Sequence, residues 1–401
     1  FFRQIFSDLH SRLTHFNLPK ISVTTTTSKC CTAFINALLA PCLPRKIEKV
    51  IGIDPHLYQK TLHNGLNFYV RKNDYPFPNK AYLRLVLRVG MLNETPKEKG
   101  IAHLIEHIAQ IETTNFAKDE IMNYLSKKGV NWGRDYNAHT GPEETVYKLD
   151  IPLDDPDSLE KSILILSEVA SKATLSEDII NNEKEIVIDE LSQKRNIWNR
   201  YANAKRALKC AGSPYATLVD RDREIESIRN CSKETVQNFY KRWYHPKNMA
   251  VIAVGDFDPK KTGDLIEKHF GKIPRSNTAP SEHKYTLDVR PEKQFLCFTD
   301  PEITHSIVEI QHQLPPLPRE EWNGTMEEKD ILRGLTTLLF EELFQSRLDD
   351  LCEQDNSPFT DAGFSKGESI PNWSSTNFYA IANEGQIPAA FRQLLLEIKR
   401  L

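Results

Sequence analysis

The sequence predicts an α+β fold built mainly on antiparallel sheet. Strand patterns occur in pairs with helical patterns grouped between them, and the regular strand-helix alternation typical of parallel sheet is not visible. The pair Asn64-Gly65 between two apolar runs indicates a β-hairpin, which is an antiparallel element. The 401 residues are 39% hydrophobic and 27% charged, as in chains that fold around a core, and this length predicts two or three domains.

The first elements are strands. The hairpin comprises residues 58–62 and 66–70, and Asn-Gly suits a type I′ turn because both residues tolerate positive φ. In residues 83–89, Leu or Val at every second position alternates with Arg84, Val86 and Arg88, which is the period of a half-buried strand. The next elements, in chain order, are helices at 96–111 and 118–128, strands at 136–140 and 144–151, helices at 157–172 and 177–208 (with Ser176 as N-cap), a helix from 233 to about 244, a strand at 249–254 and a helix at 259–271.

The second half partly repeats this order. Residues 274–284, rich in Pro, Ser and Asn, are typical of a linker, and strands at 294–299 and 306–312 and a long helix at 327–351 follow. We therefore expect a first unit at 48–275, a linker at 276–284 and a second unit at 285–401. Because the chain begins at Phe1 without Met and ends inside a helical pattern near Phe391–Leu401, we expect a fragment whose second unit is incomplete.

The N-terminal segment 1–47 differs in composition from the rest. Residues 9–47 contain no Asp or Glu, carry five Lys or Arg, and include a hydroxyl-rich run and a short apolar run. Such a leader suits an organellar transit peptide (mitochondrion or plastid), a signal peptide of a periplasmic or secreted protein, or an unstructured or misassigned start. These alternatives leave the compartment open, and we exclude 1–47 from the fold.

Charge and cysteine usage exclude several classes of protein. The formal net charge of −3 argues against nucleic acid as the main partner, because phosphate binding usually needs a basic excess. We find no apolar run long enough for a transmembrane segment. The seven cysteines are scattered and contain no CxxC pair, which argues against a disulfide framework, a thiolate zinc site or a thiol enzyme.

The segment Gly100–His107 carries the clearest chemistry. On a helix, His103 and His107 are four residues apart and project from one face, where two neutral imidazoles can hold one Zn²⁺. Glu106 lies beside them and can take a proton from water. The order His-x-x-Glu-His is the inverse of the commoner zinc motif. The alternative is a polar helix face whose histidines bond to their neighbours.

A zinc site needs a third protein ligand, and the helix at 177–208 offers candidates. Glu183 and Glu190 are seven residues apart, two helical turns, and so share a face. The apolar residues 186–188 between them indicate partial burial, where a carboxylate is costly unless paired or bound to metal. The alternative is a solvated acidic stripe that pairs with Lys184 and Lys194.

Together these segments resemble the pitrilysin/insulinase family of zinc metallopeptidases, which includes processing peptidases and a bacterial periplasmic branch. Gly133-Arg134-Asp135 points to the bacterial and plastid-like branch. The resemblance runs from about residue 57 to the end and includes Leu92-Asn93-Glu94, Asn137-Ala138-His139-Thr140 with Glu144-Thr145-Val146-Tyr147, Ser213-Pro214-Tyr215, Phe239-Tyr240 with Trp243-Tyr244, Pro246 with Asn248-Met249, and Val254-Gly255-Asp256. It departs at residues 110–113, where the family usually has an aromatic, a small residue and Gly-Thr.

The resemblance implies a zinc-dependent metalloendopeptidase that hydrolyses unfolded peptides or small proteins. One Zn²⁺ would be held by His103, His107 and Glu190, with Glu106 as the general base. Glu183 would be an outer carboxylate that orients a ligand. Asn137 and Ala138 would lie on an edge strand to which a peptide substrate is added, although a plain structural strand is the alternative.

The family architecture also implies partners. Its repeated α+β units, each a sheet with helices on one face, enclose a chamber, so a C-terminal half or a partner subunit would complete it. The second unit repeats no zinc motif, and we expect it to be non-catalytic. The rival interpretations are a non-catalytic peptide-binding or scaffold subunit of the same fold and an inactive fragment of a larger peptidase.

Overall fold

The computed structural model describes residues 50–51, 53–75, 78–275, 293–313, 326–370 and 373–400. The expected leader 1–47 and the expected linker 276–284 lie outside the described residues. The described residues divide into two compact units, one within 53–303 and one within 304–400 that also includes residues 50–51.

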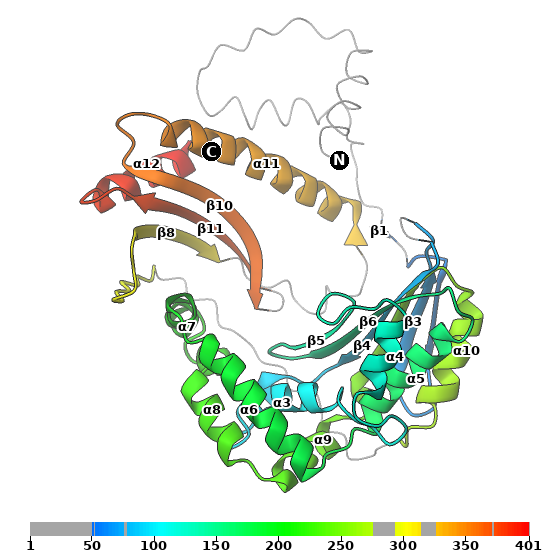
Figure 1. The fold of residues 1–401 in the computed structure, drawn as a ribbon. Helices are drawn as coiled ribbons and strands as arrows, with labels where there is room; N and C mark the ends of the chain where they lie inside the picture. The colour runs from blue at the N-terminus through cyan, green and yellow to red at the C-terminus, as the bar shows by residue number, and fades with distance from the viewer. Residues whose placement is uncertain are drawn as a thin grey trace, which may run out of the picture. The chain divides into compact units, whose positions relative to one another are not determined.

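The first unit contains a six-stranded sheet (Figure 1). Its strand order is β2-β3-β7-β4-β6-β5, and every neighbouring pair is antiparallel except β3 and β7, which are parallel. The expected α+β class with mainly antiparallel sheet is therefore confirmed. The strands are β2 (Leu57–Thr61), β3 (Asn67–Lys72), β4 (Lys80–Leu87), β5 (Tyr136–Thr140), β6 (Thr145–Pro152) and β7 (Met249–Gly255).

The hairpin of β2 and β3 is confirmed, but its expected type I′ turn is wrong. Gly65 has φ +93°, whereas Asn64 is absent from the residues with positive φ. The Asn64 side chain is buried and donates to the carbonyl oxygens of Phe270 and Ile273 at 2.9 Å. Asn64 therefore serves to join the hairpin to the end of a distant helix, and this long-range bond is not visible in a local turn pattern.

Helices and three short 3₁₀ turns complete the first unit. They are η1 (Met91–Asn93), α3 (Ile101–Ile108), α4 (Glu120–Lys127), α5 (Ser158–Ser171), α6 (Glu177–Gln193), α7 (Ile197–Lys209), η2 (Pro214–Thr217), α8 (Arg221–Asn230), α9 (Lys233–Trp243), η3 (Pro246–Asn248) and α10 (Pro259–Phe270). α5 and α10 pack on the sheet, whereas α3 contacts β5 and the helices α6, α8 and α9.

The expected bounds of two helices are wrong, and one helix was missed. The helix expected at 96–111 comprises only α3, because Gly100 has φ +82°, a left-handed conformation that starts the helix at Ile101. The helix expected at 177–208 is interrupted at 194–196, where the Asn196 side chain accepts from Asn199 N and begins α7. Helix α8 was not expected at all.

The second unit has a three-stranded antiparallel sheet in the order β10-β11-β8. Its strands are β8 (Ser306–Gln313), β10 (Phe359–Ile370) and β11 (Trp373–Ala382), and its helices are α11 (Glu328–Cys352) and α12 (Ile387–Lys399). β1 (Val50–Ile51) pairs with β9 (Met326–Glu327). The expected strand 306–312 and helix 327–351 are confirmed. The expected strand 294–299 is wrong, since those residues form no ladder.

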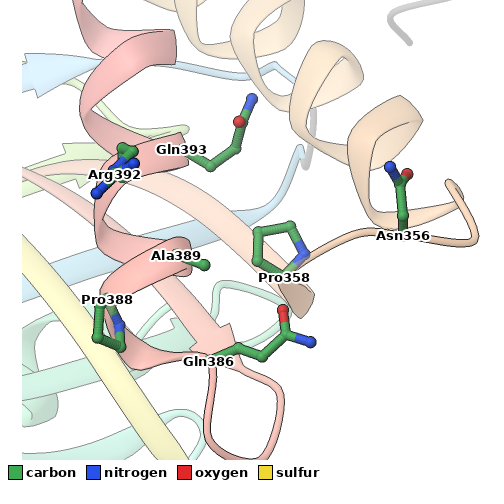
Figure 2. Close-up of a pocket in the computed structure, with 7 residues that line it drawn as sticks. All are labelled: Asn356, Pro358, Gln386, Pro388, Ala389, Arg392 and Gln393. Carbon is green, nitrogen blue, oxygen red and sulfur yellow. The ribbon is translucent and has the colours of Figure 1, made fainter.

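A shallow pocket of the second unit lies beside the start of α12 (Figure 2). It has a volume of about 470 Å³, and Arg392 is the one charged side chain in its lining. Its lining contains no acidic side chain, histidine or cysteine, so it offers no group for metal binding or proton transfer. Among the described residues, no helix combines the length and the apolar character that crossing a bilayer requires.

Candidate metal centre

Helix α3 presents both histidines on one face. Ile101, Leu104 and Ile108 are buried on its other side, so packing fixes the rotation of the helix. The rings of His103 and His107 meet edge to face with 4.9 Å between their centroids. The polar face expected from the sequence is therefore turned toward a neighbouring element, which is α6.

Helix α6 supplies the carboxylates. Ser176 caps it by accepting from Ile179 N at 3.3 Å, as expected. Glu190 Oε1 lies 3.6 Å from His103 Nε2, and its Oε2 lies 3.4 Å from His107 Nε2. Glu183 Oε2 lies 3.5 Å from the other ring nitrogen, His107 Nδ1. The structure thus brings together all four residues that the sequence suggested for metal ligation and its support.

The donor set fits a zinc ion. One ligand atom from each of His103, His107 and Glu190 can be chosen so that all three lie within 4.8 Å of one another, and no other such group occurs among the described residues. Ligand atoms about 2.0–2.2 Å from a tetrahedral Zn²⁺ are about 3.3–3.6 Å apart, close to the two His–Glu distances given above. Two imidazoles and one carboxylate leave a fourth position for water, as in catalytic zinc sites.

The electrostatics of the group favour a bound cation. Burial lowers the pKa of His103 to about 4, so this imidazole is neutral at physiological pH. Burial works against charging His107 as well, but the Glu183 and Glu190 carboxylates raise the pKa of His107 to about 9. The hydrogen bond with His107 lowers the pKa of Glu190 in spite of burial. The carboxylates therefore hold a proton on His107, and a metal ion takes the place of that positive charge when it binds.

Glu106 lies on the same helix as the histidines and is only 5% exposed. Its Oε2 accepts a hydrogen bond of 2.8 Å from the Thr140 hydroxyl. Burial raises the pKa of Glu106, and the Thr140 bond counteracts part of that rise. Gln110 is the first residue of the segment that departs from the family pattern, and its side-chain Nε2 donates to the Glu106 carbonyl oxygen at 3.0 Å, just after the end of α3.

Strand β5, which carries Asn137 and Ala138, is an edge strand that pairs only with β6. Asp150 N donates to Asp135 O at 2.8 Å, so Asp135 and alternate residues after it face β6. The backbone groups of Ala138 and Thr140 therefore face the open edge. This is the geometry that an extended peptide needs to add a strand.

Sequence reasoning missed the role of one residue that touches the centre. Thr140 is 34 residues from Glu106, so only the folded structure shows their bond. Lys194 forms an ion pair with Glu190 one helical turn away, as the alternative of an acidic stripe paired with lysines expected. Lys194 also lines a pocket of about 600 Å³ between the end of α6, helix α7 and the start of α8, which places that pocket beside the metal centre.

Comparison with protein families agrees with this geometry. The sequence model "Insulinase (Peptidase family M16)" matches residues 69–212, which include every residue of the centre described above. The model "Peptidase M16 inactive domain" matches residues 230–401. The chain belongs to the insulinase peptidase family, M16. The fold class and the resemblance found in the sequence are thereby confirmed.

Several relatives of this M16 chain carry the name zinc protease. It is 34% identical over 283 residues to the "Zinc protease PQQL-like" of Arabidopsis thaliana, over 70% of this chain and 29% of the relative. It is 34% identical over 222 residues to the "Probable zinc protease PqqL" of Haemophilus influenzae, over 55% of this chain and 24% of the relative. A chloroplastic stromal processing peptidase of Arabidopsis thaliana is 27% identical over 57% of this chain and 18% of that relative. The chain thus spans less than a third of these three relatives.

Solved structures show the same fold. The periplasmic protease PqqL of Escherichia coli matches with a TM-score of 0.73 and 22% identity, over 87% of this chain and 38% of that chain. A structure of the first half of that protease matches with the same TM-score over 87% of this chain and 73% of that chain. Relatives from both a periplasm and a chloroplast are compatible with the compartments that the leader suggested.

Proposed function

We propose that this chain is the zinc-bearing part of a metalloendopeptidase that hydrolyses peptide bonds of unfolded peptides or small proteins. The observation that carries the proposal is the convergence of His103, His107 and Glu190 beside the buried Glu106. The relatives that are named zinc proteases support it. His103 and His107 would bind zinc through their ring nitrogens, Glu190 through its carboxylate, and Glu183 would orient His107.

The residues of the chain divide the chemistry between them. When bound, zinc polarises the scissile carbonyl and lowers the pKa of water to about 7. Glu106 accepts the proton of the attacking water and returns it to the leaving amine. The Thr140 hydroxyl holds Glu106 Oε2, which leaves Oε1 to face that proton. Burial of Glu106 keeps bulk water from competing for its carboxylate.

The open edge of β5 supplies the substrate site of this proposal. In the proposal, an extended peptide bonds to the outward backbone groups of Ala138 and Thr140, and the bond between Thr140 and Glu106 supports a position of that peptide beside the proposed general base. Ala138 N now donates to the Asn137 side-chain oxygen at 2.9 Å, a bond that the incoming peptide would replace. The selectivity of such a site rests on side chains, since backbone bonds are common to all peptides.

The chamber of this proposal needs more protein than the chain provides. The chain covers 38% of the PqqL structure and 73% of its first half, so we propose that a C-terminal half or a partner subunit completes the chamber. Within the described residues, the second unit repeats no group of metal ligands. Its role in the proposal is to form the chamber, not to catalyse.

Substitution Glu106→Gln tests the general base. The amide keeps the size of the side chain but cannot accept the proton, so we expect zinc content to stay at one per chain and peptide cleavage to fall by about 10³-fold. Elemental analysis and cleavage of a quenched fluorescent peptide measure the two quantities. Glu185→Gln, an exposed change on α6, is the matched control. Full activity of Glu106→Gln would show that Glu106 is not the general base. A wild-type chain that binds zinc but cleaves no peptide would favour a non-catalytic subunit.

A further inference from the structure

Residues 131–135 form a loop, here called the edge loop, that closes one end of the open edge of β5. Gly133 N donates to Tyr136 O at 2.8 Å, and Tyr136 N donates to Asn131 O at 3.2 Å. Trp132 forms an isolated bridge with Tyr136 on the side away from β6. The outward backbone groups of Tyr136 are therefore already used, and an added peptide strand can pair only with Ala138 and Thr140.

The edge loop is firmly anchored. The Asp135 carboxylate is buried and accepts from Asn131 N at 3.1 Å and from Arg134 Nη2 at 2.6 Å. Lys80 Nζ lies 3.7 Å from the same carboxylate. Lys148 Nζ donates to Arg134 O at 2.6 Å, which holds the loop to β6. With this many bonds at its base, the loop is a fixed stop at the end of the edge.

The side chain that the edge loop presents is Trp132. Trp132 is 54% exposed, and its indole packs edge to face on the buried Tyr136 ring, with 5.5 Å between centroids. Arg134 is also exposed, but its guanidinium already donates two hydrogen bonds to Asp135. The free binding surface here is thus aromatic and apolar, not cationic.

We propose that the edge loop ends the pairing of the bound peptide at Ala138 and that Trp132 selects a bulky apolar side chain at the next positions of that peptide. The inference rests on the proposed function, because it takes β5 as the docking edge. A peptide residue opposite Thr140 lies beside Glu106. The peptide pairs with β5 residue by residue, and Trp132 lies opposite Tyr136, four residues from Thr140. The peptide side chain that contacts Trp132 is therefore about four positions from the peptide residue beside Glu106. The enzyme would therefore select a bulky apolar residue at a fixed number of positions from the cleaved bond.

Binding to the zinc-loaded Glu106→Gln chain tests the inference without cleavage. Fluorescence anisotropy is measured with labelled ten-residue peptides in which a single Phe is moved along a Ser- and Ala-rich sequence. We expect one or two adjacent positions where Phe binds about tenfold tighter than Ser or Asp. Adding Trp132→Ala should reduce this ratio to less than twofold, whereas Trp132→Phe, which keeps a ring on Tyr136, should retain most of it.

Trp198→Ala is the matched control, because Trp198 is an exposed tryptophan of the same unit on α7. The inference is overturned if Trp132→Ala leaves the Phe preference intact, if Arg134→Ala rather than Trp132→Ala abolishes the preference, or if no peptide binds. Trp132-dependent binding by a wild-type chain that cleaves nothing would support the edge loop and count against the peptidase. Peptide cleavage whose selectivity is the same in wild type and Trp132→Ala would support the peptidase and count against the role of the edge loop.

Discussion

Two buried helical carboxylates, Glu397 in the second unit and Glu106 in the first, have different hydrogen-bond donors. In the second unit, Glu397 on α12 is fully buried and bonds to the guanidinium groups of Arg347 and Arg400. In the first unit, Glu106 on α3 is nearly as buried, yet its donor is the neutral hydroxyl of Thr140. An uncompensated buried carboxylate costs stability, whereas a paired one can contribute to it. The ion pairs of Glu397 suit a structural role, whereas the neutral donor of Glu106 suits the general base that we propose.

The largest expected effect comes from removing one of the proposed zinc ligands of the first unit. His103→Ala and Glu190→Ala should each lose bound zinc and with it nearly all peptide cleavage, because two remaining ligands hold the ion weakly. Dialysed protein is analysed for zinc and assayed on the same quenched peptide. His56→Ala, an exposed histidine outside the group, is the control and should keep one zinc. Stoichiometric zinc in Glu190→Ala would mean that a different carboxylate is the ligand.

Glu94, beside the start of α3, is another buried carboxyl of the first unit that forms no ion pair among the described residues. Its Oε1 accepts from Ala102 N at 2.9 Å, and in the described part of the chain its Oε2 has no hydrogen-bond partner. Burial raises the pKa of Glu94 to about 8, above the value of about 4.5 in the unfolded chain. The folded state therefore binds more protons between these values, and this group makes stability fall as pH rises from about 5 to 8.

Glu94→Gln should remove that fall. The variant should have a free energy of unfolding on the order of 3 kcal/mol above wild type at pH 8, with the difference vanishing near pH 4.5. Urea unfolding across pH 5–8 measures it. Glu98→Gln is the opposing control, because its Arg242 partner lowers the pKa of Glu98 against burial, so the substitution should destabilise at neutral pH. If the free energies of unfolding of Glu94→Gln and wild type change with pH in the same way, the raised pKa of Glu94 is not what makes stability fall.

The residues of the candidate metal centre could be predicted from the sequence, but the contacts between distant segments could not. The spacing of His103 and His107 and of Glu183 and Glu190 follows helical geometry, so the ligand faces could be read from local pattern. The Thr140 bond to Glu106 joins a strand to a helix 34 residues away and has no local signal. Such a bond depends on how the strand packs against the helix, and the hydrophobic pattern of the sequence does not predict that packing.

The errors in the fold have the same cause. No Gly or Pro lies between Glu190 and Arg200, so the break between α6 and α7 had only the capping Asn196 as its signal. Residues 294–299 have a strand-like pattern, but a strand also needs a partner, and they form no ladder. Local propensity identified the long elements, whereas interruptions and partners were set by the rest of the chain.

The structural role of Glu397 gives a third and smaller effect. Glu397→Ala should lower the free energy of unfolding of the second unit by about 2 kcal/mol, because it leaves Arg347 and Arg400 without their shared acceptor while both remain half exposed to water. Zinc content should not change. Urea unfolding measures the free energy of unfolding, and elemental analysis measures the zinc content. Glu384→Ala, an exposed change in the same unit, should be neutral. Loss of zinc in Glu397→Ala would erase the contrast between the units.

The smallest expected effect tests what a neutral donor does for Glu106. Thr140→Val keeps the shape of the side chain but removes its hydroxyl, so Glu106 Oε2 loses its bond and the carboxylate is free to rotate away from the attacking water. We expect kcat to fall about tenfold with KM little changed and zinc retained, since positioning acts on the chemical step. Thr140→Ser restores the hydroxyl and should restore kcat, which a purely structural role of Thr140 in β5 would not require. Equal kcat values for the Val and Ser variants would show that the packing of β5, not the bond to Glu106, is what Thr140 provides.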